Sequence, residues 1–252
     1  MITRAELTDY LHNFLSVDRF NDYCPNGLQV EGRETITILV TGVTASLALI
    51  EEAIARKADA LLVHHGYFWK NESLPITGSK KGRLQRLLTN DLNLLAYHLP
   101  LDSHATLGNN AQLARVLNIT PTQALTIDRW ENLLWLGDLD EPQTPDVFAR
   151  YLELRLGQAP MHFPGNKNSI RRVAWCSGAA QSFLERAADL GVDAYISGEV
   201  SESTFHVATE RGIHYYGAGH HATERYGIKA LGQHLSETFG LVHHFVDIPN
   251  PV

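Results

Sequence analysis

Cysteine is scarce in this sequence, and its scarcity excludes two kinds of stabilised fold. Among 252 residues the only cysteines are Cys24 and Cys176, which lie far apart and form no C-x-x-C spacing. A disulfide framework and a structural zinc ribbon both need closely grouped cysteines. We therefore interpret both residues as packed thiols, including Cys176 in the WCSG segment at 175–178.

Long apolar runs and an excess of positive charge are also missing. Hydrophobic residues make up 44% of the chain and charged residues 19%. No unbroken apolar run is long enough to cross a bilayer, and no N-terminal signal pattern is present. We therefore expect a cytoplasmic globular protein with no membrane partner. The formal net charge of −7 disfavours nonspecific binding to DNA.

Common nucleotide-binding and nucleophile motifs are absent, with one partial exception. The sequence contains neither G-x-x-x-x-G-K-[ST] nor G-x-S-x-G. The segment GAGHHA at 217–222 fits the dinucleotide pattern G-x-G-x-x-A between an expected strand and an expected helix. However, the acidic residue Asp247 comes late, and His220 and His221 would crowd a pyrophosphate. We rank a dinucleotide site below a metal site.

Histidine, by contrast, is abundant. There are thirteen, and six of them form the adjacent pairs His64-His65, His220-His221 and His243-His244. Neighbouring residues on a strand point to opposite faces, so one site uses both His64 and His65 only where the strand ends and the chain turns, as Gly66 permits. The alternative is that one histidine packs in the core and the other is solvated. We interpret the pair at 243–244, inside the last strand, as structural.

The hydrophobic pattern alternates strands and helices along most of the chain. The first helix begins with a capping box, Thr3 to Glu6, and the strand–helix–strand order implies parallel crossovers. The expected strands lie at 36–43, 60–63, 94–97, 173–176, 194–197, 213–216 and 241–246. The expected helices lie at 3–14, 46–57, 83–88, 111–117, from 144 onward, and at 182–190, 203–210 and 223–239.

The two halves of the chain resemble each other. TGVTASLALIEEAIARKADALLVHHG in the first half and SGAAQSFLERAADLGVDAYISGEV in the second share the pairs Gly42/Gly178, Ser46/Ser182 and Asp59-Ala60/Asp193-Ala194. We therefore expect two similar α/β lobes, an internal duplication, with mainly parallel sheets flanked by helices. The lobes would span residues 1–125 and 126–252, and the C-terminal helix and strand are candidates to pack back on the first lobe.

Polar residues stand at matching strand ends in both halves. His64, His65 and Asp102 follow strands of the first half, whereas His220 and Glu224, four residues apart, open a helix of the second. Ligands bind beyond the carboxyl ends of strands in open parallel sheets, so we expect a metal site in a cleft between the lobes. Five nitrogen and oxygen donors without thiolate fit Zn, Fe, Mn, Ni or Co. Two such ions, roughly 3.5–4 Å apart with Glu224 as the bridge, would use all five donors.

Several segments together resemble one family. PNGLQVEG, GVTAS, DALLVHHGYFWK, LPLDSH, SGEVSE and AGHHATERYGI are similar to the GTP cyclohydrolase 1 type 2 homologs, also called the NGG-one-interacting-factor-three-like family, and the resemblance runs nearly from end to end. It implies a dinuclear divalent-metal site with Glu224 shared. It also implies a two-lobed α/β protomer that assembles into a toroidal homo-hexamer, a ring of dimers. The implied ligands are His64, His65, Asp102, His220 and Glu224.

These features favour a metal-dependent hydrolase of the GTP cyclohydrolase 1 type 2 kind, acting on a nucleotide or a related heterocycle. Two metal ions would activate water against a purine C8 or a similar electrophile, and His98, His104 and Glu199 are candidates for the proton transfers. The alternative is a non-enzymatic, ring-shaped metal-binding adaptor or metal-handling protein. A third hypothesis, DNA passing through the ring, is disfavoured by the net charge.

Overall fold

The chain forms two compact units in a computed structural model that describes residues 1–127 and 129–252. Unit 1 comprises Met1–Leu107 and Gly227–Pro249, and unit 2 comprises Gly108–Tyr226 and Asn250–Val252. The first division thus lies at 107/108 rather than near residue 125, because β7 (Ile119–Ile127) pairs with β8 (Trp130–Gln143) inside the second unit's sheet. No helix in either described stretch is both long and apolar enough to cross a membrane.

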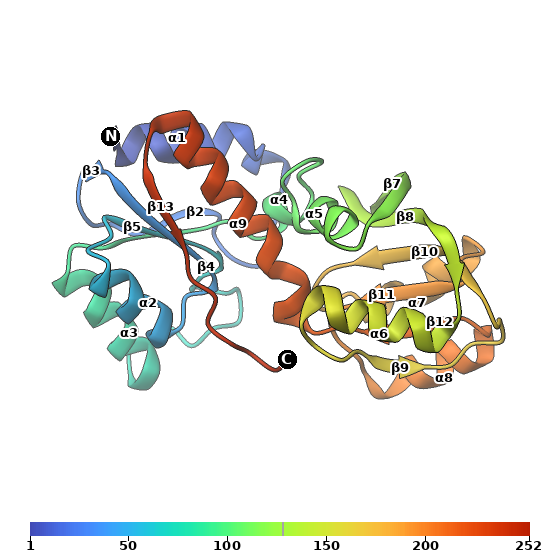
Figure 1. The fold of residues 1–252 in the computed structure, drawn as a ribbon. Helices are drawn as coiled ribbons and strands as arrows, with labels where there is room; N and C mark the ends of the chain where they lie inside the picture. Colours follow the sequence, from blue (N-terminus) through green and yellow to red (C-terminus); the bar gives the residue numbers. More distant parts are fainter. Residues whose placement is uncertain (128) are drawn as a thin grey trace. The chain divides into compact units, whose positions relative to one another are not determined.

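Unit 1 contains a five-stranded sheet with helices on both faces (Figure 1). The order is β13-β4-β5-β6-β2, in which β13, β4, β5 and β6 are mutually parallel neighbours and β2 is antiparallel to β6. Its strands are β2 (Gly27–Val30), β4 (Ile38–Thr44), β5 (Ala60–His65), β6 (Asn93–Ala96) and β13 (Val242–Phe245), beside the small antiparallel pair β1 (Ile2–Thr3) and β3 (Thr35–Ile36). Its helices are α1 (Arg4–Phe14), the 3₁₀ helix η1 (Val17–Arg19), α2 (Leu47–Ala55), α3 (Gly78–Thr89), α4 (Leu99–Asp102) and the part of α9 (His220–Phe239) from Gly227 onward.

Alternating apolar residues on the strands of unit 1 supply both faces of its sheet. Leu62 packs in one cluster with Leu7 of α1 and Leu231 of α9. Its neighbour Leu61 points to the other face and packs in a cluster with Leu49 of α2 and with α3. Both faces of the sheet are therefore covered, as the nearly continuous apolar runs of its central strands require.

Unit 2 contains a six-stranded sheet, also with helices on both faces (Figure 1). The order is β7-β8-β10-β11-β12-β9; β10, β11 and β12 are parallel, whereas the β7–β8, β8–β10 and β12–β9 pairs are antiparallel. Besides β7 and β8, its strands are β9 (Met161–Phe163), β10 (Ile170–Cys176), β11 (Ala194–Ser197) and β12 (His214–Gly217). Its helices are α5 (Asn109–Val116), α6 (Pro145–Leu156), the 3₁₀ helix η2 (Gln181–Phe183), α7 (Leu184–Asp189), α8 (Glu202–Arg211) and the first turns of α9.

The core of unit 2 follows the same alternation. Ile196 on β11 packs in a cluster with Phe148 and Leu152 of α6. Tyr195, the preceding residue, packs on the opposite face with Leu184 of α7 and Ala208 of α8. Its hydroxyl donates a hydrogen bond to the carbonyl oxygen of Ala180, so this large buried side chain keeps its polar group satisfied.

Both sheets are mixed, which corrects the expectation of mainly parallel sheets. The helical crossovers predict only the parallel centre of each sheet. The edge strands β2, β9 and β7, and β8 beside β7, are antiparallel to their neighbours and are too short, too polar or too irregular for the pattern to reveal them. β7, for example, has a largely exposed face and two register shifts against β8.

The two units nevertheless share one strand order. In unit 1 three parallel strands, β4-β5-β6, are followed in space by β2, which precedes them in sequence and runs antiparallel to β6. In unit 2 the parallel strands β10-β11-β12 are followed by β9 in the same way. In each unit a helix connects each parallel strand to the next.

Candidate metal centre

In unit 1, β5 ends on two histidines whose ring orientation is set by their neighbours. His64 is fully buried, and its Nδ1 donates to the carbonyl oxygen of Tyr97 at 3.0 Å. A ring nitrogen that donates in this way carries the proton, which leaves Nε2 as the nitrogen for a metal. That Nε2 lies 3.5 Å from an oxygen of Asp102. The arrangement is therefore a buried histidine–carboxylate pair.

His65 is half-buried beside His64. Its Nδ1 lies 3.2 Å from the hydroxyl of Thr44, and the centroids of the two histidine rings are 4.6 Å apart. The chain must turn directly after it, and Gly66 is required there for space rather than for a special backbone angle. A Cβ at Gly66 would lie 2.2 Å from the side-chain oxygen of Gln29.

Asp102 reaches the same end of the sheet from the next strand. After β6 the chain forms α4, a single helical turn that includes Pro100 and ends at Asp102. The Asp102 side chain is almost wholly buried, with 8% of its surface exposed. Burying a carboxylate is costly without a charged or hydrogen-bonding partner, and His64 is one such partner.

In unit 2 the first turns of α9 carry a second histidine–carboxylate pair, in which Glu224 is buried and His220 is half-buried. His220 and Glu224 are four residues apart on one helix face, and His220 Nε2 lies 2.9 Å from Glu224 Oε2. The other ring nitrogen, Nδ1, lies 2.6 Å from Glu199. Burial lowers the pKa of His220, but the hydrogen bonds and charges of Glu224 and Glu199 outweigh it and raise the pKa to about 9.

The backbone of Gly178 approaches this pair closely. Gly178 has a φ of +65°, and a Cβ there would lie 2.0 Å from Glu224 Oε1 and 3.2 Å from His220 Nε2. Only glycine satisfies both the backbone angle and the space without moving Glu224. The glycine therefore helps to fix the position of a buried carboxylate that would serve as a ligand.

The three residues expected to transfer protons lie in different surroundings. Glu199 is held against His220. His104 accepts a hydrogen bond from the Leu107 N–H at 3.1 Å and stacks on Phe14 with ring centroids 4.7 Å apart. His98 donates from Nδ1 to Asp22 at 2.9 Å, a carboxylate partner that the sequence pattern did not reveal.

The donors fit a catalytic divalent cation by their chemistry. Each unit offers an imidazole nitrogen pre-oriented by a hydrogen bond and a buried carboxylate oxygen, and the five expected ligands include no thiolate. This set is typical of Zn, Fe, Mn, Ni or Co rather than of a structural zinc site. In unit 1 alone, one ring nitrogen from each of His64, His65 and His98 lies within 4.8 Å of the others.

Histidine–carboxylate pairs at the strand ends of mixed α/β units define a class of α/β protein with a candidate metal centre. Within that class, the chain belongs to the Duf34/NIF3 (NGG1p interacting factor 3) family, whose model matches residues 2–251. The chain is 52% identical over 248 residues to the "GTP cyclohydrolase 1 type 2 homolog" of Yersinia pestis, covering 98% of each chain.

Two solved structures extend the comparison to the fold. The structure described as "protein ybgI, unknown function" matches with a TM-score of 0.95 and 50% sequence identity, covering 100% of both chains. TTHA1606 from Thermus thermophilus matches with a TM-score of 0.88 and 35% identity, again over 100% of both chains. The similarity therefore extends over the whole chain in sequence and in fold.

Proposed function

We propose that the chain binds two divalent metal ions through donors from both units and acts as a metal-dependent hydrolase on a nucleotide or a related heterocycle. The observation that carries the proposal is that each unit holds one histidine–carboxylate pair with a buried carboxylate, His64–Asp102 in unit 1 and His220–Glu224 in unit 2. The name shared by the curated relatives, "GTP cyclohydrolase 1 type 2 homolog", supports the reaction class.

The number of donors supports two ions rather than one. With His65, the proposed set has five donors, more than one catalytic ion usually takes from a protein, and the two oxygens of the Glu224 carboxylate suit a bridging role.

The shared strand order supports a related proposal about origin. Three parallel strands followed by one antiparallel edge strand recur in both units with the same connections. We propose an internal duplication after which each copy kept the framework and acquired its own donors. A duplication of this kind gives both copies the same strand ends, and ligands bind beyond such ends in α/β sheets.

In the proposed mechanism, divalent ions held by these residues would supply Lewis-acid polarisation of the electrophile and would lower the pKa of water. The chain's own residues keep the donors in place. The Tyr97 carbonyl holds the tautomer of His64, and Glu199 orients His220 through Nδ1. We accordingly propose Glu199 as a positioning residue and His104, bonded within its own loop, as a structural one.

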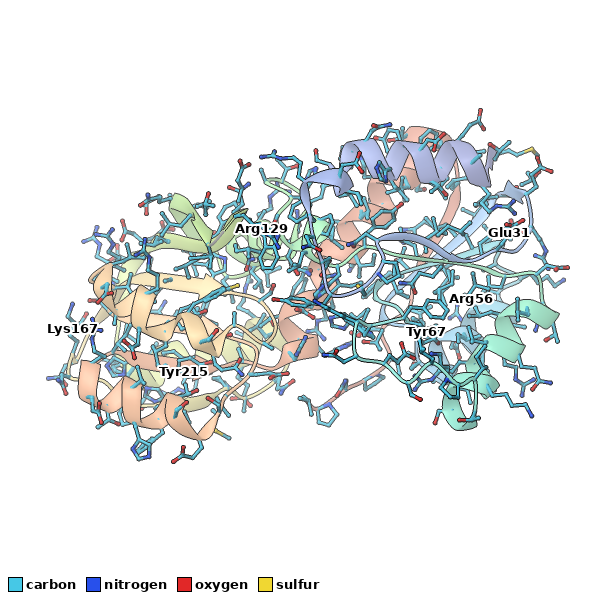
Figure 2. The ribbon with its side chains drawn as sticks, turned by 180° about the vertical axis from the view of Figure 1, so that it is seen from behind. Glu31, Arg56, Tyr67, Arg129, Lys167 and Tyr215 are labelled. Atoms are coloured by element: carbon cyan, nitrogen blue, oxygen red, sulfur yellow. The ribbon has the colours of Figure 1, made fainter. Side chains whose placement is uncertain are left out.

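Two aromatic residues after β5 have different surroundings: Tyr67 lies in the core of unit 1, and Trp69 lies beside the donors of β5. Tyr67 is 6% exposed, packs in the core of unit 1 (Figure 2), and donates its hydroxyl proton to the Ala45 carbonyl oxygen, so it is poorly placed to stack a base. Trp69 is half-buried, and its ring meets the ring of His98 edge-on at 5.1 Å. We propose Trp69 as an apolar wall of the site, beside the donors of β5.

The test is an assay of metal-reconstituted protein against GTP and a panel of nucleotides. We expect turnover that chelators abolish and that Glu224→Gln abolishes, since this variant keeps the side-chain shape but removes the charge. His206→Gln, which alters an exposed histidine bonded to Glu202, is the matched control and should retain activity. Two tightly bound ions without turnover would contradict the hydrolase and favour a non-enzymatic metal-binding adaptor.

We also propose, from the family resemblance, that the chain assembles into a ring-shaped homo-hexamer. The loop between β5 and α3 exposes Leu74 and Ile76, at 89% and 56%, which are apolar side chains suited to an interface between copies. Light scattering should give a mass near six chains.

Binding of duplex DNA is disfavoured by the net charge of −7. A salt-dependent mobility shift of a labelled duplex would contradict that expectation.

A further inference from the structure

The segment NDYCPNG at 21–27 turns the chain and also makes hydrogen bonds to the residues that follow β6. Asp22, in this segment, has a side chain that is only 1% exposed. Its Oδ1 accepts hydrogen bonds from the Tyr23 N–H at 2.6 Å and from His98 Nδ1 at 2.9 Å. Its Oδ2 accepts from Asn26 Nδ2 at 2.9 Å and from the Leu99 N–H at 3.0 Å. Four donors therefore converge on one buried carboxylate.

The same segment also holds the backbone of His98. Asn26 Oδ1 accepts the His98 N–H at 2.7 Å, so the segment binds both the main chain and the ring of this residue. Burial alone would raise the pKa of Asp22, but the hydrogen bonds and the charge of His98, with the Asn26 and Tyr23 donors, outweigh it and lower the pKa. Because each oxygen of Asp22 accepts two hydrogen bonds, the contact with His98 places the hydrogen on His98 Nδ1.

The ring that Asp22 orients lies beside the candidate ligands of unit 1. The centroid of the His98 ring is 5.1 Å from that of His64 and 5.7 Å from that of His65. One ring nitrogen from each of the three histidines lies within 4.8 Å of the other two. Since Nδ1 is bonded to Asp22, Nε2 is the His98 nitrogen suited to a cation held by its neighbours.

A separate cation site at Asp22, Cys24 and His98 fits less well. These three residues also lie close enough to share an ion, but both oxygens of Asp22 already accept two hydrogen bonds each. Burial, with a smaller effect from the charge of Asp22, raises the pKa of the Cys24 thiol to about 12. A protonated thiol is a poor ligand.

We propose that His98 is a further protein ligand of the metal pair, with Nε2 as its donor atom and with Asp22 as the carboxylate that fixes its tautomer and orientation. The inference rests on the proposed function, because it assumes that His64 and His65 hold metal. Carboxylate–histidine–metal arrangements raise the basicity of the ligating nitrogen and hold the ring in one orientation. The NDYCPNG segment then serves as the support for a ligand that follows β6.

The first test is a metal titration of purified, metal-stripped full chain with Zn²⁺ and with Mn²⁺, in competition with a chelator. Asp22→Asn should weaken the affinity of one of the two ions roughly 10–100-fold, the usual cost of removing such a partner. His98→Gln should weaken the same ion at least as much. The control is the exposed pair of the same kind, His12 Nε2 and Asp18 Oδ1 at 3.0 Å, where His12→Gln and Asp18→Asn should leave both affinities unchanged.

The second test uses the wild-type chain, so it does not depend on the folding of a variant. Histidine-selective ¹⁵N spectra are recorded before and after Zn²⁺ is added. We expect the chemical shift of His98 Nε2 to change to that of a metal-bound nitrogen, while Nδ1 keeps its proton. Wild-type affinity in a folded His98→Gln variant, or an unmoved Nε2 signal in zinc-loaded wild type, would overturn this inference alone. A wild type that binds no divalent ion would overturn the proposed function as well.

Discussion

Each unit uses an aspartate at an equivalent position to hold the start of its first parallel strand, β4 in unit 1 and β10 in unit 2. Asp59 accepts hydrogen bonds from the Thr37 and Ile38 N–H groups, both at 2.9 Å, and pairs with Arg33 at 3.0 Å. Asp193 does the same for Arg171 and Arg172, at 2.9 and 2.8 Å, and pairs with Lys167, which is labelled in Figure 2. The framework is therefore repeated down to individual hydrogen bonds.

The opposite ends of the same strands differ. Ala60 of β5 and Ala194 of β11 occupy equivalent places, since each pairs with the strand that precedes it in sequence, β4 or β10. Counting forward from them, His64 and His65 fall at the positions of Gly198 and Glu199. Unit 1 thus places its donors on the strand end, whereas unit 2 places them on α9 and uses Glu199 to hold one of them. The framework is common, and the chemistry is specific to each unit.

Single substitutions of a candidate ligand, one in each unit, should have the largest effect on metal binding. Glu224→Gln and His64→Gln should each weaken metal binding by more than about 100-fold, because each removes a ligand atom rather than an outer partner. Metal content after dialysis against a chelator measures the loss, with thermal unfolding as the check on folding. If Glu224→Gln still retained two ions per chain, unit 2 would supply framework only.

The close approach of Gly178 to Glu224 should make it the next most sensitive position. Gly178→Ala should cost up to about 3 kcal/mol, from the left-handed backbone angle and the displaced carboxylate together. Gly191→Ala is the control, since Gly191 has a similar φ of +69° with nothing within 4 Å of its Cβ position. It should cost only about 1 kcal/mol of strain.

Urea unfolding and metal titration should separate the two glycine variants. Both should lose stability, but only Gly178→Ala should also lose metal affinity. Equal behaviour in both measurements would show that the space beside Glu224 has no role.

The repeated carboxylates should respond alike. Asp59→Asn and Asp193→Asn should each cost about 2 kcal/mol, because each weakens two backbone hydrogen bonds to a charged group. Burial raises the pKa of both carboxyls, but the backbone hydrogen bonds and the cation beside each outweigh it and lower the pKa in the folded state. The stability they add is then present above the unfolded pKa of about 3.9 and is lost as the pH falls through the lower folded value.

Urea unfolding between pH 3 and 7 tests this pair. Each Asn variant should lose less stability on acidification than the wild type, and by a similar amount. If only one of the two variants lost unfolding free energy, the equivalent hydrogen bonds of the two aspartates would not contribute equally to stability.

The smallest expected loss of stability comes from Ser46→Ala, which is compared with Ser182→Ala because the sequence aligns the two serines. Ser46 accepts the Leu49 N–H at the start of α2, at 3.2 Å, so Ser46→Ala should cost about 1 kcal/mol. Ser182 lies exposed in η2, and no side-chain cap is described there or at the start of α7, so Ser182→Ala should leave the unfolding midpoint unchanged. An equal loss of unfolding free energy in both variants would mean that the two serines have the same role, as the sequence alignment suggests.

The parts of the fold that sequence predicts are those fixed by local periodicity. The parallel strands, their crossover helices and the capping box at Thr3 follow from alternation and helical spacing. The antiparallel edge strands depend on pairing between distant segments, as when β9 joins β12. The division at 107/108 likewise depends on which sheet β7 joins, and no local pattern at residue 125 records it.

The candidate site shows the same limit. The sequence predicts the candidate ligands because histidine and carboxylate stand at its strand ends and helix starts; they are His64, His65, Asp102, His220 and Glu224. Asp22 was missed because it stands in a turn segment 76 residues from His98, and only the fold brings the two together. Ser46 caps α2, whereas Ser182 lies within η2, because the residues after β4 and after β10 form different turns.

The most direct test of the account is anomalous diffraction from crystals of the metal-loaded chain. We predict two anomalous peaks per chain, with His64, His65 and Asp102 of unit 1 and His220 of unit 2 as ligands and the Glu224 carboxylate touching both. A single peak bound only by residues of unit 1, or no peak at any of these five side chains, would contradict it.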